Sequence, residues 1–188
     1  MTGVVLAGGA GRRLGGRDKA LEPFRGRPLI HHVLERLRPQ VGTILISANR
    51  NHDLHERTGY RVIGDLTPGV PGPLAGLEAA LTATATPWLV TVPCDTPFLP
   101  LHLVATLIGT DPEPPPVTVA HDGQRLQPAF ALLHRNLLAD LSACLAAGER
   151  KLGAWLTRHP WRAARMTEDP RSFVNLNTPG DWTPWEEP

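Results

Sequence analysis

Hydrophobic and polar positions follow two alternating periods along the chain, one typical of strands and one typical of helices. Short apolar or β-branched runs predict strands at residues 4–7, 43–48, 60–63, 88–92, 117–120 and 129–133. Between these runs, apolar residues recur at helical spacing and predict helices at 29–37, 74–81, 101–108 and 137–145. This order predicts an α/β fold with a doubly wound, mostly parallel sheet flanked by helices. A hairpin signal at Asp122-Gly123 predicts that one strand runs antiparallel.

Composition narrows the class of protein. The chain has 188 residues, of which 41% are hydrophobic and 20% charged, which favours one folded domain spanning residues 1–188. Two cysteines exclude a disulfide scaffold. A net charge of +1 argues against a nucleic-acid partner, and no apolar run approaches the ~20 residues that cross a membrane. We therefore expect a soluble cytoplasmic protein.

A glycine-rich segment follows the first predicted strand. Residues 8–19 read GGAGRRLGGRDK, which combines five glycines with the cations Arg12, Arg13, Arg17 and Lys19. Glycines let backbone amides approach an anion, and Arg and Lys neutralise it, so this segment predicts a polyphosphate site. It is not a P-loop, because Arg17 and Asp18 follow the spaced glycines. It is not a dinucleotide fingerprint either, because Leu14 replaces the third glycine.

Carboxylates follow two other predicted strands. Asp65 comes after the third strand, and Asp95 follows the fourth between Pro93 and Pro97. In an open α/β sheet, ligands bind beyond the carboxyl ends of the strands. Beside a polyphosphate, Asp95 would hold Mg²⁺, which binds through one or two carboxylates plus phosphate oxygens. The alternative is that Asp95 only caps the next helix. We interpret the neighbouring Cys94 as a buried thiol.

Two further clusters have competing interpretations. Residues 173–179, FVNLNTP, alternate like a strand, which would place Asn175 and Asn177 on one face. Their amides could read a heterocycle or satisfy turn backbone groups. His52, Asp53, His55 and Glu56 have the helical spacing of metal ligands, but they lack an apolar face and favour a solvated helix.

Together these motifs resemble those of a known family over nearly the whole chain, from about Gly3 to Trp182. The chain resembles the molybdenum cofactor guanylyltransferases (MobA) within the nucleotidyltransferase superfamily. The LAGG element at 6–9 is shared by many nucleotidyltransferases. More specific are GPLAG at 72–76, PCDTP at 93–97 and NLNTPGD at 175–181.

The resemblance implies transfer of GMP from GTP to molybdopterin, with release of pyrophosphate and Mg²⁺ as cofactor. It also implies transient contacts with other proteins of molybdenum cofactor biosynthesis. Ser47 stands where some relatives have Asn near the nucleotide, and Asn49 is a candidate substitute. The roles carried over are nucleotide contacts for Leu6, Ala7, Gly8 and Lys19, phosphate contact for Arg13, guanosine binding for Asp65, metal binding for Asp95, and the molybdopterin side for Asn175 and Asn177.

Such a transfer needs no protein nucleophile, because the terminal phosphate of molybdopterin can attack the α-phosphorus of GTP directly. Arg13 and Lys19 would then stabilise charge on the transferring and leaving groups. Two alternatives remain. One is a cytidylyltransferase or sugar-phosphate nucleotidyltransferase of the same fold. The other is a non-catalytic carrier of nucleotide or molybdopterin.

Overall fold

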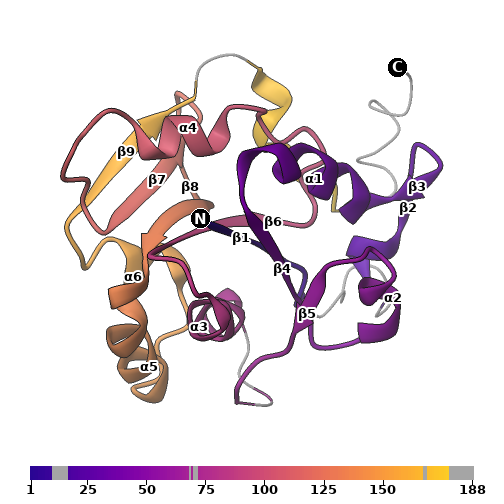
Figure 1. Ribbon diagram of the computed structural model, residues 1–188, viewed down its shortest axis with the longest axis horizontal. Helices are drawn as coiled ribbons and strands as arrows, with labels where there is room; N and C mark the ends of the chain where they lie inside the picture. The colour runs from indigo at the N-terminus through magenta and orange to yellow at the C-terminus, as the bar shows by residue number, and fades with distance from the viewer. Residues whose placement is uncertain (10–16, 68, 70–71, 167–168, 178–188) are drawn as a thin grey trace.

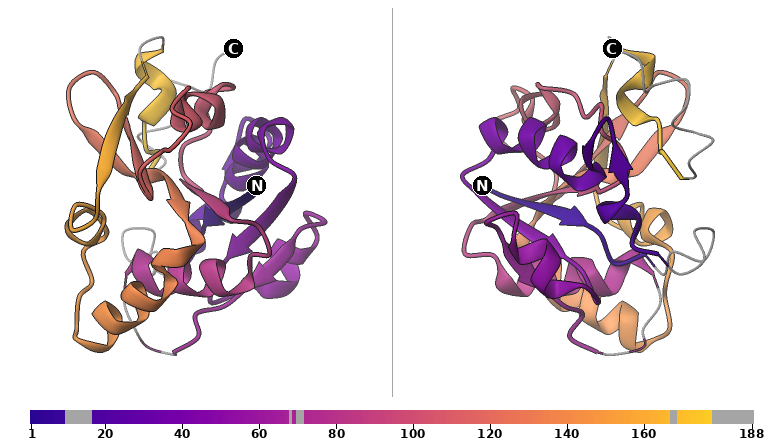
Figure 2. Two further views of the ribbon diagram at one scale, coloured as in Figure 1. Left: turned by 60° about the vertical axis from the view of Figure 1, so that its left-hand side comes forward. Right: turned by 90° about the vertical axis from the view of Figure 1, so that its right-hand side faces the viewer.

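A seven-stranded sheet organises the computed structural model, which describes residues 1–9, 17–67, 69, 72–166 and 169–177. The strand order is β5-β4-β1-β6-β8-β7-β9, so β5 and β9 form opposite edges (Figures 1 and 2). A separate two-stranded hairpin pairs β2 with β3. The strands are β1 (Thr2–Leu6), β2 (Pro23–Phe24), β3 (Arg27–Pro28), β4 (Thr43–Ser47), β5 (Arg61–Ile63), β6 (Trp88–Pro93), β7 (Val117–His121), β8 (Leu126–His134) and β9 (Trp161–Arg165).

The predicted parallel sheet is confirmed. Strand β1 pairs in parallel with β4 and β6, and β4 pairs in parallel with β5. Strand β8 runs antiparallel to both β6 and β7, as the hairpin at Asp122-Gly123 predicts. Strand β9, which we did not predict, pairs in parallel with β7.

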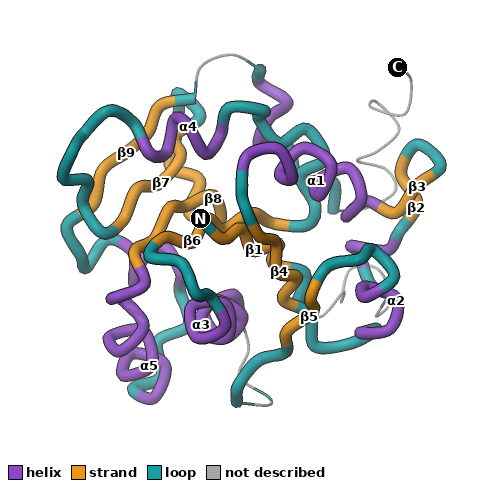
Figure 3. Tube along the Cα trace, viewed as in Figure 1, coloured by secondary structure: helices purple, strands orange, loops and turns teal. Residues whose placement is uncertain are grey.

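Helices cover both faces of the sheet (Figures 1 and 3). The side chain of Val5 packs with α1 and α4, whereas that of Val4 packs with α3, α5 and α6, because neighbouring strand residues point to opposite faces. The helices are α1 (Leu29–Leu37), α2 (His52–Glu56), α3 (Pro73–Ala83), α4 (Leu103–Ile108), α5 (Leu138–Ala146) and α6 (Leu152–Leu156), with 3₁₀ turns η2 (Lys19–Leu21), η3 (Arg38–Gln40), η4 (Arg135–Leu137) and η5 (Pro170–Phe173). Among the described residues, no helix has the length and apolar character needed to cross a bilayer.

Two local predictions were wrong. Residues 174–177 do not form a strand: η5 ends at Phe173, and the chain then runs irregularly past the end of β6, where the Leu176 amide donates to the Asp95 carbonyl at 2.9 Å. The apolar alternation there reflects Leu176, which is buried in a small cluster with Phe24 of β2 and Leu29 at the start of α1. Helix α2 exists, but it is not wholly solvated, because His55 is fully buried.

Candidate active site

The ends of β1, β4, β5 and β6 meet at one edge of the sheet. The Ala7 amide donates to the Ser47 carbonyl at 2.8 Å, and the Cys94 amide donates to the Leu6 carbonyl at 3.2 Å. These bonds extend the parallel ladders by one residue beyond the strands. They place Leu6, Ala7 and Gly8 between the segment after β4 and the segment that carries Asp95, as the strand-end argument predicts.

Lys19 joins two sequence-distant segments at this edge. Its ammonium group contacts the Asp95 carboxylate and donates to Asn177 Oδ1 at 2.6 Å. Lys19 and Asp95 keep only 19% and 14% of their side-chain surface exposed, so the ion pair lies in a half-desolvated setting where charge interactions are stronger than in water. The structure therefore brings together three of the predicted site residues.

One carboxylate oxygen of Asp95 has no hydrogen-bond partner among the described residues. This oxygen is the buried Oδ1, whereas Oδ2 faces Lys19. No group of three or more His, Cys, Asp or Glu side chains gathers there or elsewhere in the described part of the chain. One carboxylate oxygen suffices for Mg²⁺ when phosphates supply further ligands, so Asp95 fits such a metal.

Asp65 is held by Asn49, which follows β4. The Asn49 amide donates from Nδ2 to Asp65 Oδ2 at 2.6 Å, and the Asp65 backbone N–H donates to Asn49 Oδ1 at 2.9 Å. Burial raises the pKa of Asp65 above its usual value, and the nearby Glu78 adds to this, while the Asn49 hydrogen bond opposes it. The result is a fixed acceptor at the end of β5.

Ser47 and Gly76 explain part of the GPLAG sequence. Ser47 is buried at the end of β4, and a β-carbon at Gly76 would overlap its Oγ. Glycine therefore lets α3 approach the sheet edge closely. Ser47 is too enclosed by α3 to occupy an open ligand site, whereas Asn49 lies beside Asp65.

Side chains from the α2 region secure the two ends of the glycine-rich segment. Arg50 donates to the carbonyl of Gly9 at 3.1 Å and to that of Arg17 at 2.9 Å. Asn51 and His55 both contact Asp18, which precedes Lys19. Arg13 lies outside the described residues, so its predicted phosphate contact stays a prediction.

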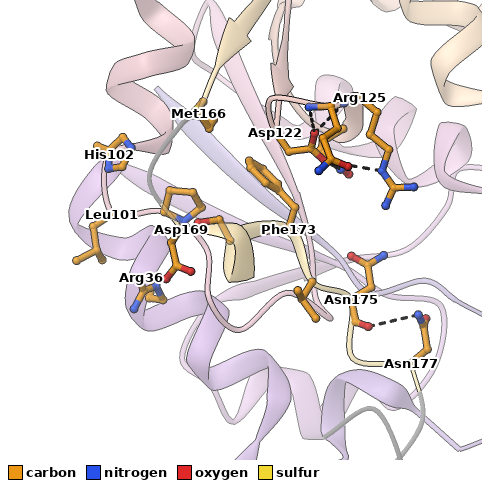
Figure 4. A pocket seen from close by; sticks show the side chains of 15 residues that line it. Arg36, Leu101, His102, Asp122, Arg125, Met166, Asp169, Phe173, Asn175 and Asn177 are labelled. Carbon is orange, nitrogen blue, oxygen red and sulfur yellow. Dashed lines mark hydrogen bonds and ion pairs between the residues drawn. The ribbon is translucent and has the colours of Figure 1, made fainter. Parts of the chain in front are cut away.

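An open groove, lined in part by Asn177, lies next to the Lys19 cluster (Figure 4). It has a volume of about 760 Å³, and Asn177 belongs both to its lining and to the Lys19 cluster. Asn175 also lines it, with its backbone carbonyl facing the Asn177 amide. The β7–β8 turn contributes Asp122 and Arg125, and Phe173 stands in the middle of Figure 4. The two asparagines thus lie at one site, although not through a strand.

Cys94 lacks the exposure and the lowered pKa that a nucleophilic thiol needs. Its side chain is buried, and burial together with the adjacent Asp95 charge raises the pKa of the thiol. A thiol that stays protonated is a poor nucleophile. The interpretation as a packed thiol is confirmed.

Sequence reasoning missed the contributions of Arg50, Asn51 and His55, and it named Asn49 only as a substitute for Ser47. All four follow β4, and the strand-end rule could have found Asn49, Arg50 and Asn51, which lie nearest to the strand. His55 carried no such signal, because the residues around it on α2 are exposed.

A glycine-rich sequence after β1, a paired lysine and two carboxylates at the carboxyl edge of a parallel sheet define a nucleotide-binding α/β protein of the nucleotidyltransferase class. Comparison with known proteins agrees. Residues 3–164 match the family described as the MobA-like NTP transferase domain, and the chain belongs to that family.

Individual relatives support this placement. The chain is 45% identical over 177 residues to a molybdenum cofactor guanylyltransferase of Shewanella halifaxensis, covering 94% of this chain and 88% of the relative. It is similar in structure to molybdopterin-guanine dinucleotide biosynthesis protein A of Archaeoglobus fulgidus, with a TM-score of 0.79, 25% identity, and 100% and 97% of the two chains covered. It also shares the fold of Rv0371C of Mycobacterium tuberculosis in complex with manganese, with a TM-score of 0.71, 20% identity, and 100% and 97% covered.

Proposed function

We propose that this protein transfers the GMP group of GTP to molybdopterin, forming molybdopterin guanine dinucleotide and pyrophosphate. One observation carries the proposal: Lys19 bridges Asp95 and Asn177 at the junction between the nucleotide edge of the sheet and the open groove. A group-transfer enzyme must bring two anionic substrates together, and this cation lies where the two regions meet.

On the nucleotide side, Asp65 would accept hydrogen bonds from the N–H groups of the guanosine moiety. Asn49 holds both the carboxylate and the backbone amide of Asp65, so the acceptor is oriented before the nucleotide arrives. Leu6, Ala7 and Gly8 would lie along the nucleotide, and Arg13 would face its phosphates.

On the groove side, Asn175 and Asn177 would contact molybdopterin. The groove is lined mainly by polar and charged side chains and remains open to solvent, which suits a pterin with a phosphate group. The terminal phosphate oxygen of molybdopterin would form a bond to the α-phosphorus of GTP. The bond from that phosphorus to the β-phosphate oxygen breaks, and pyrophosphate leaves.

Lys19 would stabilise the charge that shifts onto the leaving pyrophosphate. Asp95 would hold Mg²⁺ through its unpartnered Oδ1. When bound, Mg²⁺ neutralises phosphate charge and polarises the phosphorus–oxygen bonds. We also propose that the enzyme works in the cytoplasm and touches other proteins of molybdenum cofactor biosynthesis transiently.

A thermal-shift panel tests the nucleotide assignment. GTP, ATP, CTP and UTP are compared with and without Mg²⁺. A ligand at 100 times its Kd stabilises a protein by about 2.7 kcal/mol, which a melting curve resolves. A shift selective for GTP is expected, and a shift selective for CTP or UTP would overturn the guanylyl assignment.

Pyrophosphate release then tests the transfer itself. Pyrophosphate should appear only when GTP and molybdopterin are both present. Binding of GTP without pyrophosphate release would identify a non-catalytic carrier instead.

A further inference from the structure

His55 is a buried polar residue on an otherwise exposed helix. Within α2, it is the residue that the structure buries, and its exposed fraction is 0%. A buried imidazole is costly unless its polar atoms are satisfied. Its Nε2 lies 3.1 Å from Asp18 Oδ2, and Asp18 itself is only 8% exposed. The pair is therefore a buried polar contact, and solvent does not screen it as it would a surface ion pair.

The direction of this hydrogen bond follows from the surroundings. His55 Nδ1 has no hydrogen-bond partner among the described residues. Hydrogen bonds from His55 and Asn51 outweigh the effect of burial and hold the pKa of Asp18 below its usual value, so its carboxylate is charged and only accepts. Nε2 of His55 therefore donates to Asp18.

Asp18 is immobilised by donors on both of its oxygens. Oδ2 accepts from His55 and from Asn51 Nδ2 at 3.0 Å, while Oδ1 accepts from the backbone N–H of Ala20 at 3.1 Å. The last bond makes Asp18 the N-cap of η2, the turn that begins with Lys19. The orientation of the Asp18 carboxylate thus fixes the backbone from which the Lys19 side chain extends.

A lysine side chain is long and has many rotamers, so the position of its ammonium group depends on a fixed backbone. Lys19 must reach Asp95 and Asn177 at once. A displacement of about 1 Å at a reacting centre can cost ~100-fold in rate. Without the donor at position 55, Asp18 keeps only the hydrogen bonds from Asn51 and from the Ala20 backbone, and the turn carrying Lys19 becomes less constrained.

We propose that His55 is a positioning residue for Lys19, acting through its buried hydrogen bond to Asp18. It touches neither substrate. This inference rests on the proposed function for its kinetic consequence, but the placement of Lys19 can be observed without catalysis.

Nuclear magnetic resonance gives the direct test. The chain has two lysines, Lys19 and the exposed Lys151, so protein labelled with ¹³Cε,¹⁵Nζ-lysine gives two side-chain signals. Lys19→Arg assigns them. In the wild type, the Lys19 signal should be separate from that of Lys151. His55→Leu should move the Lys19 signal toward the Lys151 position. His55→Gln should keep it close to wild type, because a glutamine amide can donate from nearly the same place.

Kinetics give the second readout. We expect His55→Leu to lower kcat by roughly 10- to 30-fold, because the Lys19 ammonium group is displaced. The KM for GTP should stay within about threefold of the wild-type value, because the guanosine contacts remain. His55→Gln should recover most of kcat. His52→Leu, on the exposed side of the same helix, and Leu141→Ala, in the core on the opposite face of the sheet from α1, are the controls for helix and stability effects.

The outcomes separate the two proposals. Absence of pyrophosphate release by the wild type would overturn the proposed function and leave the resonance test intact. An unchanged Lys19 signal in His55→Leu would overturn the positioning role. So would equal loss in His55→Gln and His55→Leu, or a loss in Leu141→Ala as large as in His55→Leu at a matched Tm.

Discussion

The regions on the two sides of Lys19 are built in different ways. On the nucleotide side, side chains of one short segment after β4 hold the other site elements: Asn49 holds Asp65, Arg50 ties Gly9 to Arg17, and Asn51 and His55 fix Asp18. On the groove side, the lining comes from several separate segments, and its exposed members are Leu101, Gln124, Arg125 and Asn175. The described residues of the nucleotide side are held by hydrogen bonds from this one segment, whereas the groove is an open surface assembled from several segments.

This difference indicates in which of the two regions a single substitution should weaken ligand binding more. A preorganised site spends little free energy on ordering its groups when the ligand arrives, so removing one support has a large effect. An exposed side chain of an open groove contacts a ligand in competition with water, so each such contact contributes little. We therefore expect substitutions at the junction and on the nucleotide side to have larger effects than substitutions in the groove.

The largest expected effect is at the junction. Lys19→Ala should reduce kcat at least ~100-fold, about 2.7 kcal/mol of barrier, because a positioned cation beside the phosphates is lost. Lys151→Ala is the matched control, since Lys151 is an exposed lysine directly before α6. Steady-state pyrophosphate release measures both. Near-normal turnover of Lys19→Ala would remove this residue from the mechanism.

The next effect concerns the stability of the nucleotide side. Asp18 has a pKa below its usual value, so its charged form stabilises the fold at pH values above the unfolded-state pKa, and that stability is lost as pH falls through the folded-state value. Asp18→Asn should lower the free energy of unfolding by about 2 kcal/mol at pH 7, a factor of roughly 30 in the folded ratio.

Urea unfolding at a series of pH values measures this difference. It should begin to shrink as the pH falls below about 4, the unfolded-state pKa, and should vanish only below the folded-state pKa of Asp18, which lies lower. Asp53→Asn, exposed on α2, is the control and should show no such trend. A stability difference that is independent of pH would show that the carboxylate charge is not what Asn51 and His55 stabilise.

The contrast between the two sides also explains what the sequence could predict. Glycines, a lysine and carboxylates directly after strands form a local pattern, so Lys19, Asp65 and Asp95 could be placed at one edge from strand order alone. Lys19 and Asp95 then proved to be in contact. The parallel sheet followed from hydrophobic periodicity, which is strongest in buried strands.

The missed features depend on tertiary contacts that leave no local pattern. The alternation at 173–179 indicated a strand, but Leu176 is buried against Phe24 and Leu29 and its amide donates to the Asp95 carbonyl, so the described residues 174–177 do not join the sheet. His55 looked like a solvated residue because its helix has no apolar face, and its partner Asp18 lies in a distant part of the sequence. Periodicity does not reveal a polar pair of that kind.

A tenfold change in KM is expected at Asn49, which holds the proposed guanosine-binding residue Asp65. Asn49→Ala should raise the KM for GTP about tenfold, close to 1.4 kcal/mol, because Asp65 loses the amide that orients it. The KM for molybdopterin should stay unchanged. Asn136→Ala, at an exposed position in η4, is the control. Equal increases in both KM values would mean that Asn49 supports the whole edge and not the nucleotide side in particular.

The smallest expected effect lies in the groove. Arg125 extends from the β7–β8 turn, and its side chain is 79% exposed. An exposed cation interacts weakly with an anion, because water screens the charge. Arg125→Ala should therefore raise the KM for molybdopterin only about threefold and leave GTP binding unchanged. The increase should shrink further at high salt, whereas the loss in Asn49→Ala should persist, since it arises from a hydrogen bond and not from screened charge. A large, salt-independent loss in Arg125→Ala would show that the groove is as preorganised as the nucleotide side, and the comparison between the two regions would fail.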